Sequence, residues 1–315
     1  MLVYKIKVKQ EGRITQLLDS QKIFGALMHL LTNQGYSSIA SEIVSEVEAG
    51  NMIFMISNLM PEGYLPVPNI EISEIKSKEE YKKLKARAFV SEKELLEGKI
   101  VTEIVDFLEI EPGQSSQNYI RSEGLGIPGL KNALYSVPTI KLVRNKDKEQ
   151  IKDFCFLLSI EEENKHRMKL MELLERMAQD KTCFLLGQRA SQGFNTYRTV
   201  EVEKPKKWKQ ADRYLNLGML LPNTSKSACL DYNESHLKLF TSERRPYYGR
   251  FPGENFSKYE NFISFIEAGS IIKLKEFNLT KISKCIDTTN ILGSSFQTII
   301  FGNSFLYPLS NEVKV

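Results

Sequence analysis

Cysteine, histidine and tryptophan are scarce in this chain of 315 residues, which contains four cysteines, three histidines and one tryptophan. The cysteines lie far apart and form no Cys-x-x-Cys pair: Cys155, Cys183, Cys229 and Cys285. This spacing argues against a zinc ribbon and a disulfide framework, and it suits a reducing compartment. Because no signal-peptide pattern follows Met1, we expect a cytoplasmic protein.

Long apolar runs and the common catalytic motifs are also missing. No run approaches the ~20 residues that span a bilayer. The chain has no Gly-x-Ser-x-Gly elbow and no His-Glu-x-x-His or paired His/Cys spacing for a metal. We therefore expect no catalytic residue, no metal and no cofactor. His29 is the candidate general base, but its place inside a helical segment fits a packed histidine too.

The chain does have the composition of an ordinary globular protein, with 42% hydrophobic and 26% charged residues. Its length allows two domains with cores of their own. The formal net charge of +4 is weak evidence for a nucleic-acid partner, so the distribution of the basic residues matters more.

The hydrophobic periodicity predicts an α+β protein. Residues 3–9 alternate like a half-buried strand with outward lysines, which suits a solvated edge or a basic binding face. Asp19 or Ser20 can cap a helix that closes at Gly35. The other main predictions are a helix over 38–49, strands over 134–143 and 151–160, and an amphipathic helix over 162–179.

Each half of the chain thus contains strand, helix and strand, which predicts two ferredoxin-like domains. The charged turn at 145–150 sets the boundary, giving an N-terminal domain over 1–148 and a C-terminal domain over 149–315. Residues from about 60 to 137 have little apolar periodicity. We interpret them as an insertion that carries a β-hairpin, with one arm over 101–110.

A glycine-containing loop over 187–196 connects an apolar strand to a β-rich one. Glycine and asparagine adopt positive φ at little cost, so several N–H groups can turn toward one anion. Arg189 adds a charged donor. The residues alone also allow a hairpin that only joins two strands. The glycine spacing fits neither a Walker loop nor the dinucleotide fingerprint.

Three further segments suit contact with phosphates or bases. Gly25 lies in the first turns of a helix, where glycine costs about 1 kcal/mol, so we expect a close approach of a backbone or ligand. Residues 244–250 combine three arginines with two tyrosines. Residues 204–213 are rich in lysine around Trp208, which fits a phosphate-tracking run or a solvated linker equally well.

The order of several blocks resembles the RAMP superfamily of CRISPR proteins, and within it the fourth subunit of the type III-A Csm effector complex. Residues 19–27 resemble the family's helix start, and residues 57–68 resemble its Ser-Asn-x-x-Pro and Leu-Pro-x-Pro block. The further matching blocks are the lysine-rich segment over 84–99, Asn118 to Arg121 with 133–136, the glycine loop, and the Glu-Gly-Ser strand over 265–270. Gln188 and Asn195 stand where the family has glycine, and Asp is missing before Arg121.

The resemblance implies a non-catalytic RNA-binding subunit of an antiviral effector complex, with RRM-like, RAMP-type ferredoxin domains. Such a subunit would hold the repeat-derived 5′ tag of the crRNA, against a large polymerase-like subunit and a backbone RAMP subunit. The hairpin would act as a thumb that contacts the target RNA near the tag. The residues expected to bind RNA are Ser20, Lys22, Phe24, Gly25, Asn118, Arg121, Lys131, Gly187, Arg189, Ser191, Gly193, Arg244, Arg245, Tyr247 and Arg250.

Two rival functions stay open. One is a RAMP endoribonuclease that cuts precursor crRNA with His29 as its base. The other is a structural scaffold without RNA contacts.

Overall fold

The computed structural model describes residues 1–69, 77–119, 133–187, 189–224, 229–243, 262–276, 278–288 and 299–309. Its largest sheet has seven strands, five of them in the order β2-β8-β1-β10-β9. These are β1 (Leu2–Gln10), β2 (Phe54–Ile56), β8 (Asp153–Ile160), β9 (Cys183–Leu185) and β10 (Thr196–Val202), while β3 (Met60–Pro61) pairs with β8 and β11 (Lys206–Lys207) with β1.

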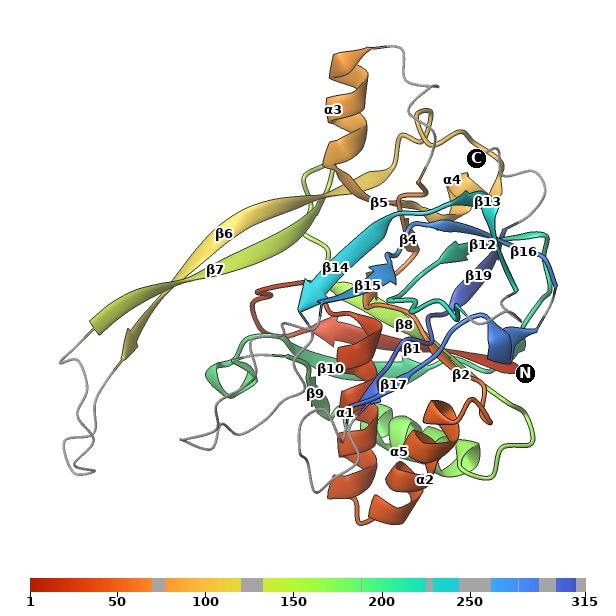
Figure 1. Cartoon of the computed structure of the whole chain (residues 1–315). Coiled ribbons are helices and arrows are strands. Elements are labelled where there is room, and N and C mark those ends of the chain that lie inside the picture. Colours follow the sequence, from red (N-terminus) through yellow and green to blue (C-terminus); the bar gives the residue numbers. More distant parts are fainter. Residues whose placement is uncertain are drawn as a thin grey trace.

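Three helices lie together beside this sheet: α1 (Ser20–Asn33), α2 (Ser37–Glu48) and α5 (Arg167–Gln179) (Figure 1). In α1, the apolar spacing buries Ile23, Leu27 and Leu31 on one side. The order β1, α1, β2, β8, α5, β10 is the ferredoxin-like pattern with an insertion after β2. The α+β class predicted from the sequence is confirmed.

The position of β1 differs from the predicted solvated edge. It lies in the middle of the sheet, paired with β8 on one side and with β10 on the other. Its lysines still point away from the buried Tyr4, Ile6 and Val8, as the alternation predicts. The edge prediction was wrong because the pairing strands β8 and β10 lie more than 140 residues away in sequence.

The sheet also joins residues from both sides of the boundary expected at 148/149. Strands β8 and β10 come after that point, yet they complete the sheet begun by β1 and β2. The helix expected for the second half, α5, packs on β10 of this same sheet, and it begins at Arg167 rather than at 162. The first ferredoxin-like unit therefore runs through Val202.

The insertion between β2 and β8 forms a second sheet of its own. Its strands are β4 (Tyr64–Pro66), β5 (Arg87–Ser91), β6 (Phe107–Tyr119) and β7 (Ala133–Arg144), with α3 (Lys78–Ala86) and α4 (Glu92–Leu96) between them. Strands β6 and β7 continue beyond the sheet as a long hairpin that projects from the body (Figure 1).

The hairpin is present as predicted, but its first arm, β6, shares only residues 107–110 with the arm predicted over 101–110. Pro112 and Gly113 look like breakers in the sequence, yet both lie inside the strand. Both strands of a projecting two-stranded hairpin are edges, where a proline removes no ladder hydrogen bond if its nitrogen faces outward. Pro138 on β7 is tolerated for the same reason.

The remaining strands build the second unit. A four-stranded antiparallel sheet has the order β13-β16-β12-β19, and β14 pairs with β15. The bounds are β12 (Arg213–Asn216), β13 (Leu230–His236), β14 (Leu239–Glu243), β15 (Phe262–Ile266), β16 (Ile271–Leu274) and β19 (Leu306–Leu309); a further short pair is β17 (Ile286–Asp287) with β18 (Ile299–Ile300).

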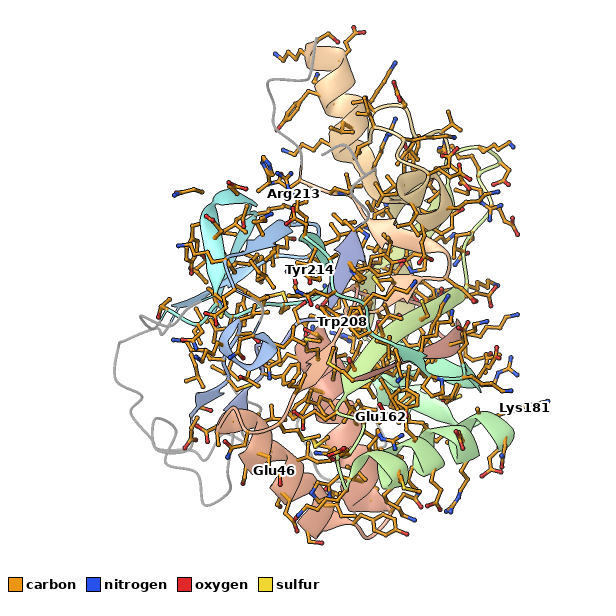
Figure 2. All side chains as sticks on the ribbon, turned by 90° about the vertical axis from the view of Figure 1, so that its right-hand side faces the viewer. Glu46, Glu162, Lys181, Trp208, Arg213 and Tyr214 are labelled. Atoms are coloured by element: carbon orange, nitrogen blue, oxygen red, sulfur yellow. The ribbon has the colours of Figure 1, made fainter. Side chains whose placement is uncertain are left out.

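Trp208 anchors the basic linker that leads into this unit. Its ring stacks on Tyr214 at a centroid distance of 5.4 Å, and Nε1 donates to the Leu306 carbonyl at 3.2 Å (Figure 2). The indole thus attaches the linker to the second unit. None of the helices that the structure describes is long and apolar enough to cross a membrane.

Candidate nucleic-acid interface

The connection between β9 and β10 contains an unusual number of left-handed residues. Gly187, Arg189, Gly193 and Asn195 all have positive φ, at 107°, 62°, 81° and 50°. Glycine and asparagine were predicted to adopt positive φ in this loop. Arginine adopts it at a cost of roughly 1–2 kcal/mol. A short 3₁₀ turn over Ala190–Gln192, which includes Ser191, lies between the two αL residues Arg189 and Gly193. Alternating left- and right-handed residues turn successive N–H groups to one side.

The loop is held against the segment that connects β1 to α1. A Cβ on Gly12 would collide with the carbonyl oxygen of Gly193, so only glycine fits at this contact. The buried side chain of Asn195 accepts from the Thr15 N–H at 3.0 Å and donates to Thr15 Oγ1 at 2.8 Å. The Asn195 N–H donates to the Arg13 carbonyl at 2.9 Å. These contacts fix the loop on the body of the protein.

Internal hydrogen bonds occupy the backbone donors in the second half of the loop. The N–H groups of Gln192, Gly193 and Phe194 donate to carbonyls of Arg189 and Ala190. The Asn195 N–H is engaged as well, so the backbone donors of residues 192–195 are satisfied within the protein. Arg189 is exposed, and its Nη1 donates to Gln192 Oε1 at 3.2 Å.

The start of α1 lies next to this region. Asp19 caps the helix by accepting from the Lys22 N–H at 3.0 Å, as predicted. Lys22 Nζ lies 3.4 Å from Asp19 Oδ2, and the Lys22 side chain is 30% exposed. Lys22 is therefore a cation at a helix N-terminus, where the helix dipole also favours a negative ligand.

Ser20 and Phe24, which we expected to bind RNA, are part of the interior. Ser20 is fully buried, its Oγ accepts from the Met219 N–H at 3.0 Å, and its own N–H donates to Asn58 Oδ1 at 2.8 Å. Phe24 is 4% exposed and stacks on Phe301 at 4.3 Å. Both residues fasten α1 to the second unit, so neither offers a surface to a ligand.

Gly25 has open space around it. A Cβ there would meet no atom within 4 Å, and the residue is exposed. Among the residues that the structure describes, none makes the close approach predicted at Gly25.

The base of the hairpin completes the interface. Arg13 Nη1 donates to Ser115 Oγ on β6, and the Ile140 N–H on β7 donates to the Ile14 carbonyl at 2.8 Å. The segment over residues 11–19 thus contacts the glycine loop, the helix start and the hairpin. Arg13 and Asn58 were missed in the sequence, since their side chains bond to partners 102 and 38 residues away.

The other predicted residues divide into two groups. Asn118 lies on β6 near the end of the projecting hairpin, opposite Leu134. Six predicted residues lie outside the described residues: Arg121, Lys131, Arg244, Arg245, Tyr247 and Arg250.

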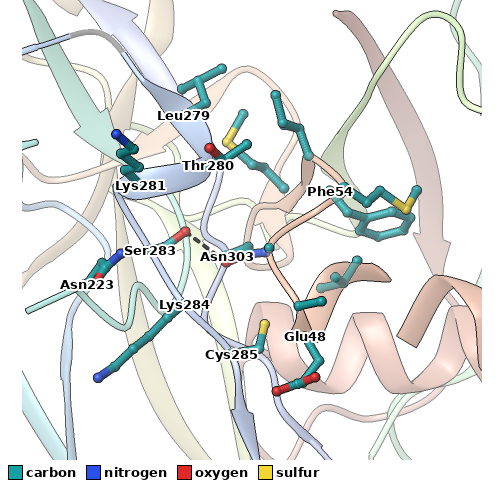
Figure 3. A pocket seen from close by; sticks show the side chains of 16 residues that line it. Glu48, Phe54, Asn223, Leu279, Thr280, Lys281, Ser283, Lys284, Cys285 and Asn303 are labelled. Carbon is teal, nitrogen blue, oxygen red and sulfur yellow. Dashed lines mark hydrogen bonds between the residues drawn. The ribbon is translucent and has the colours of Figure 1, made fainter. Parts of the chain in front are cut away.

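A cavity of about 310 Å³ lies elsewhere, between the end of α2 and the second unit (Figure 3). Glu48, Lys281 and Lys284 are among its charged residues, and Ser283 Oγ donates to Asn303 Oδ1 at 2.8 Å. None of the predicted site residues lines it, so it is separate from the interface described above.

His29 lies on the exposed side of α1, with Nε2 2.9 Å from Asn33 Nδ2. Within the described ranges, no group of three or more His, Cys, Asp or Glu residues lies close enough together to hold a metal ion.

No protein-family model and no curated protein matches this chain. Solved structures match it over almost its whole length. The Csm4 chain of a Csm3–Csm4 subcomplex from the type III-A CRISPR-Cas interference complex is 16% identical, with a TM-score of 0.57, and the match covers 98% of this chain and 100% of that chain. Csm1–Csm4 cassettes in complex with cA4 and with pppApA give 18% and 17% identity and TM-scores of 0.55 and 0.53, with 98% of both chains covered.

These matches establish the fold. The chain shares the fold of these Csm4 structures, as the resemblance in the sequence led us to expect. At such low identity, the partners and ligands of those proteins are theirs and are not transferred by the match.

Proposed function

We propose that this chain is a non-catalytic RNA-binding subunit of a type III-A CRISPR effector complex. In this role it holds the repeat-derived 5′ tag of the crRNA and bridges a large polymerase-like subunit to the backbone RAMP subunits. Its likeness over the whole chain to Csm4, which was solved with Csm1 and with Csm3, supports this assignment. Contact of this chain with a large polymerase-like subunit and with a backbone RAMP subunit is thus part of the proposal.

The observation that carries the RNA-binding role is the convergence of three elements on the segment over residues 11–19. The glycine loop, the start of α1 and the base of the hairpin are all fixed by contacts with Arg13, Ile14, Thr15 and Asp19. A single-stranded tag needs a phosphate cradle and surfaces for its bases close together. In this proposal, the glycine loop with its left-handed residues and Lys22 supply the phosphate cradle.

The hairpin is the element suited to the target RNA. Strands β6 and β7 extend well beyond the sheet that carries them (Figure 1). A rigid two-stranded projection beside a held tag can separate the guide from the target at the tag boundary. Asn118, Arg121 and Lys131 belong to this part of the proposal.

The experiment that tests the RNA-binding role changes Arg189 in the assembled complex. Loss of a charged hydrogen bond to phosphate costs roughly 1.5–3 kcal/mol, so Arg189→Ala is expected to weaken binding of 5′-tag RNA by about tenfold or more. Filter binding with tag RNA and with a scrambled RNA measures the effect.

Arg176→Ala is the matched control, because Arg176 is a surface arginine on α5 whose Nη2 lies 3.0 Å from Glu172 Oε1. It is expected to bind tag RNA like the wild type. Tag binding that is the same in both variants and the wild type would remove the glycine loop from the function.

We also propose that the chain does not cut RNA. The exposed His29 has the amide of Asn33 as its neighbour at 2.9 Å, a pair that suits a surface helix. The purified chain is incubated with repeat RNA in the absence of metal. One discrete cut that disappears in His29→Ala would establish the endoribonuclease instead.

A further inference from the structure

A cleft of about 330 Å³ opens between the start of α1 and the second unit. Its apolar lining includes Leu17, Met219 and Phe240, and its polar lining includes Lys22, Asn58 and Glu267. These residues come from five separate parts of the sequence. None of them except Lys22 was predicted as a site residue.

Phe240 is the aromatic wall of this cleft. It lies on β14 opposite the fully buried Phe265 of β15, yet 40% of its own surface is exposed. Met219, which also lines the cleft, is only 4% exposed. The cleft is therefore lined by a partly exposed aromatic ring together with a buried apolar side chain, and an aromatic ring of this kind can stack on a planar base.

The rim carries donors and acceptors together. Asn58 Oδ1 already accepts from the Ser20 N–H, so the amide nitrogen is the group that Asn58 can offer to a ligand. Glu267 lies 2.9 Å from Lys238 Nζ, and its carboxylate can accept further hydrogen bonds. A carboxylate at the rim favours a base with an exocyclic amine over uracil.

The cleft and the glycine loop lie on either side of one short segment. Thr15 holds Asn195 of the loop, while Leu17 lines the cleft two residues later. A nucleotide whose phosphate lies at the loop can therefore place a base in the cleft without leaving this region.

We infer that this cleft takes one unstacked nucleobase of the bound RNA, with Phe240 as the stacking partner and a preference for a base that carries an exocyclic amine. This inference rests on the proposed RNA-binding function. It adds the recognition of a single base to the phosphate contacts of the loop.

The test is an abasic scan of a single-stranded tag RNA against the full chain. Stacking on an aromatic side chain is worth roughly 1–3 kcal/mol per base, so removal of one particular base is expected to weaken binding by about tenfold. Uracil at that position is expected to bind less tightly than adenine or cytosine.

Phe240→Ala is expected to weaken binding of the complete RNA by a similar factor and to remove the penalty for the abasic position. Phe240→Trp should restore both the RNA affinity and the penalty for the abasic position. Leu239→Ala is the matched control, because Leu239 is the preceding residue on β14, is 67% exposed and points to the other face of the strand. It is expected to behave like the wild type.

The outcomes separate the two proposals. A wild-type chain that binds no RNA overturns both. If Arg189→Ala weakens RNA binding while Phe240→Ala equals Leu239→Ala, the function stands and the base site is wrong. An abasic penalty that persists in Phe240→Ala also overturns the base site. Free AMP or CMP binding as tightly as the RNA would assign the cleft to mononucleotides and reject its role in RNA.

Discussion

Two of the described surfaces that carry basic residues differ in what those residues contact. On the outer face of the first sheet, Lys7 Nζ lies 3.0 Å from Glu62, 3.2 Å from Glu201 and 3.0 Å from Glu203. At the proposed RNA interface, Lys22 has Asp19 at 3.4 Å, and Arg13 donates to the neutral Ser115.

This difference explains why the lysine-rich β1 is a poor candidate for RNA although its sequence looks basic. Three carboxylates surround Lys7, so its field is cancelled before it reaches a ligand. The cations beside the glycine loop keep more of their charge for a phosphate. A basic pattern in sequence therefore indicates a nucleic-acid surface only where folding does not bring acidic residues to it.

The largest loss of RNA affinity is expected from a variant that moves the glycine loop away from the cations beside it. Gly12→Ala places a methyl group against the Gly193 carbonyl. Backbone displacement of this kind costs about 1–3 kcal/mol in stability. We expect the displaced loop to lose most of its affinity for tag RNA, by tenfold or more, in filter binding.

Gly302→Ala controls for the loss of stability alone. A Cβ there would collide with the Lys284 carbonyl and the Leu221 side chain, neither of which belongs to the glycine loop. Denaturant unfolding should show a similar loss of stability in both variants, with RNA affinity reduced only in Gly12→Ala. Equal RNA affinities would mean that the position of the loop does not matter.

A smaller effect is expected from Lys22. Lys22→Gln removes one cation at the start of α1, so the slope of log affinity against log salt should fall by about one. At physiological salt, this corresponds to a severalfold loss of RNA affinity. A salt titration measures the slope, and an unchanged slope would exclude contact between Lys22 and phosphate.

Local patterns in the sequence predicted much of this fold. The central strand β8, the cap at Asp19 and the β9–β10 connection all follow from residues that are neighbours in sequence. Contacts between distant residues were not predictable in this way. Phe24 has the exposure of a core residue because Phe301 covers it, and Lys7 is neutralised by Glu62 and Glu201. Periodicity reports which face is buried but not what covers it.

The smallest effect on RNA is expected at the paired surface. Lys7→Gln should leave RNA affinity within about twofold of the wild type, because Lys7 lies in the carboxylate cluster and its side chain is only 24% exposed. It should lower stability by about 1 kcal/mol, since three carboxylates then lose their shared cation. Thermal unfolding and filter binding of the same preparation provide both values.

The loss of stability in Lys7→Gln should depend on pH in a defined direction. Burial raises the pKa of Glu203, but the hydrogen bond from Lys7 and the charges of Lys5, Lys7 and Lys206 outweigh it, so the net pKa is lowered below its usual 4.5. The stabilisation is therefore present above pH 4.5 and is lost as the pH falls through the lowered value. On the alkaline side, the Glu203 and Glu62 hydrogen bonds raise the pKa of Lys7 above 10.5, so the lysine stays charged through neutral pH. The difference in unfolding temperature between wild type and variant should thus be constant from pH 6 to 9 and shrink below pH 4.5, whereas a difference that grows toward acid would contradict the ion-paired surface.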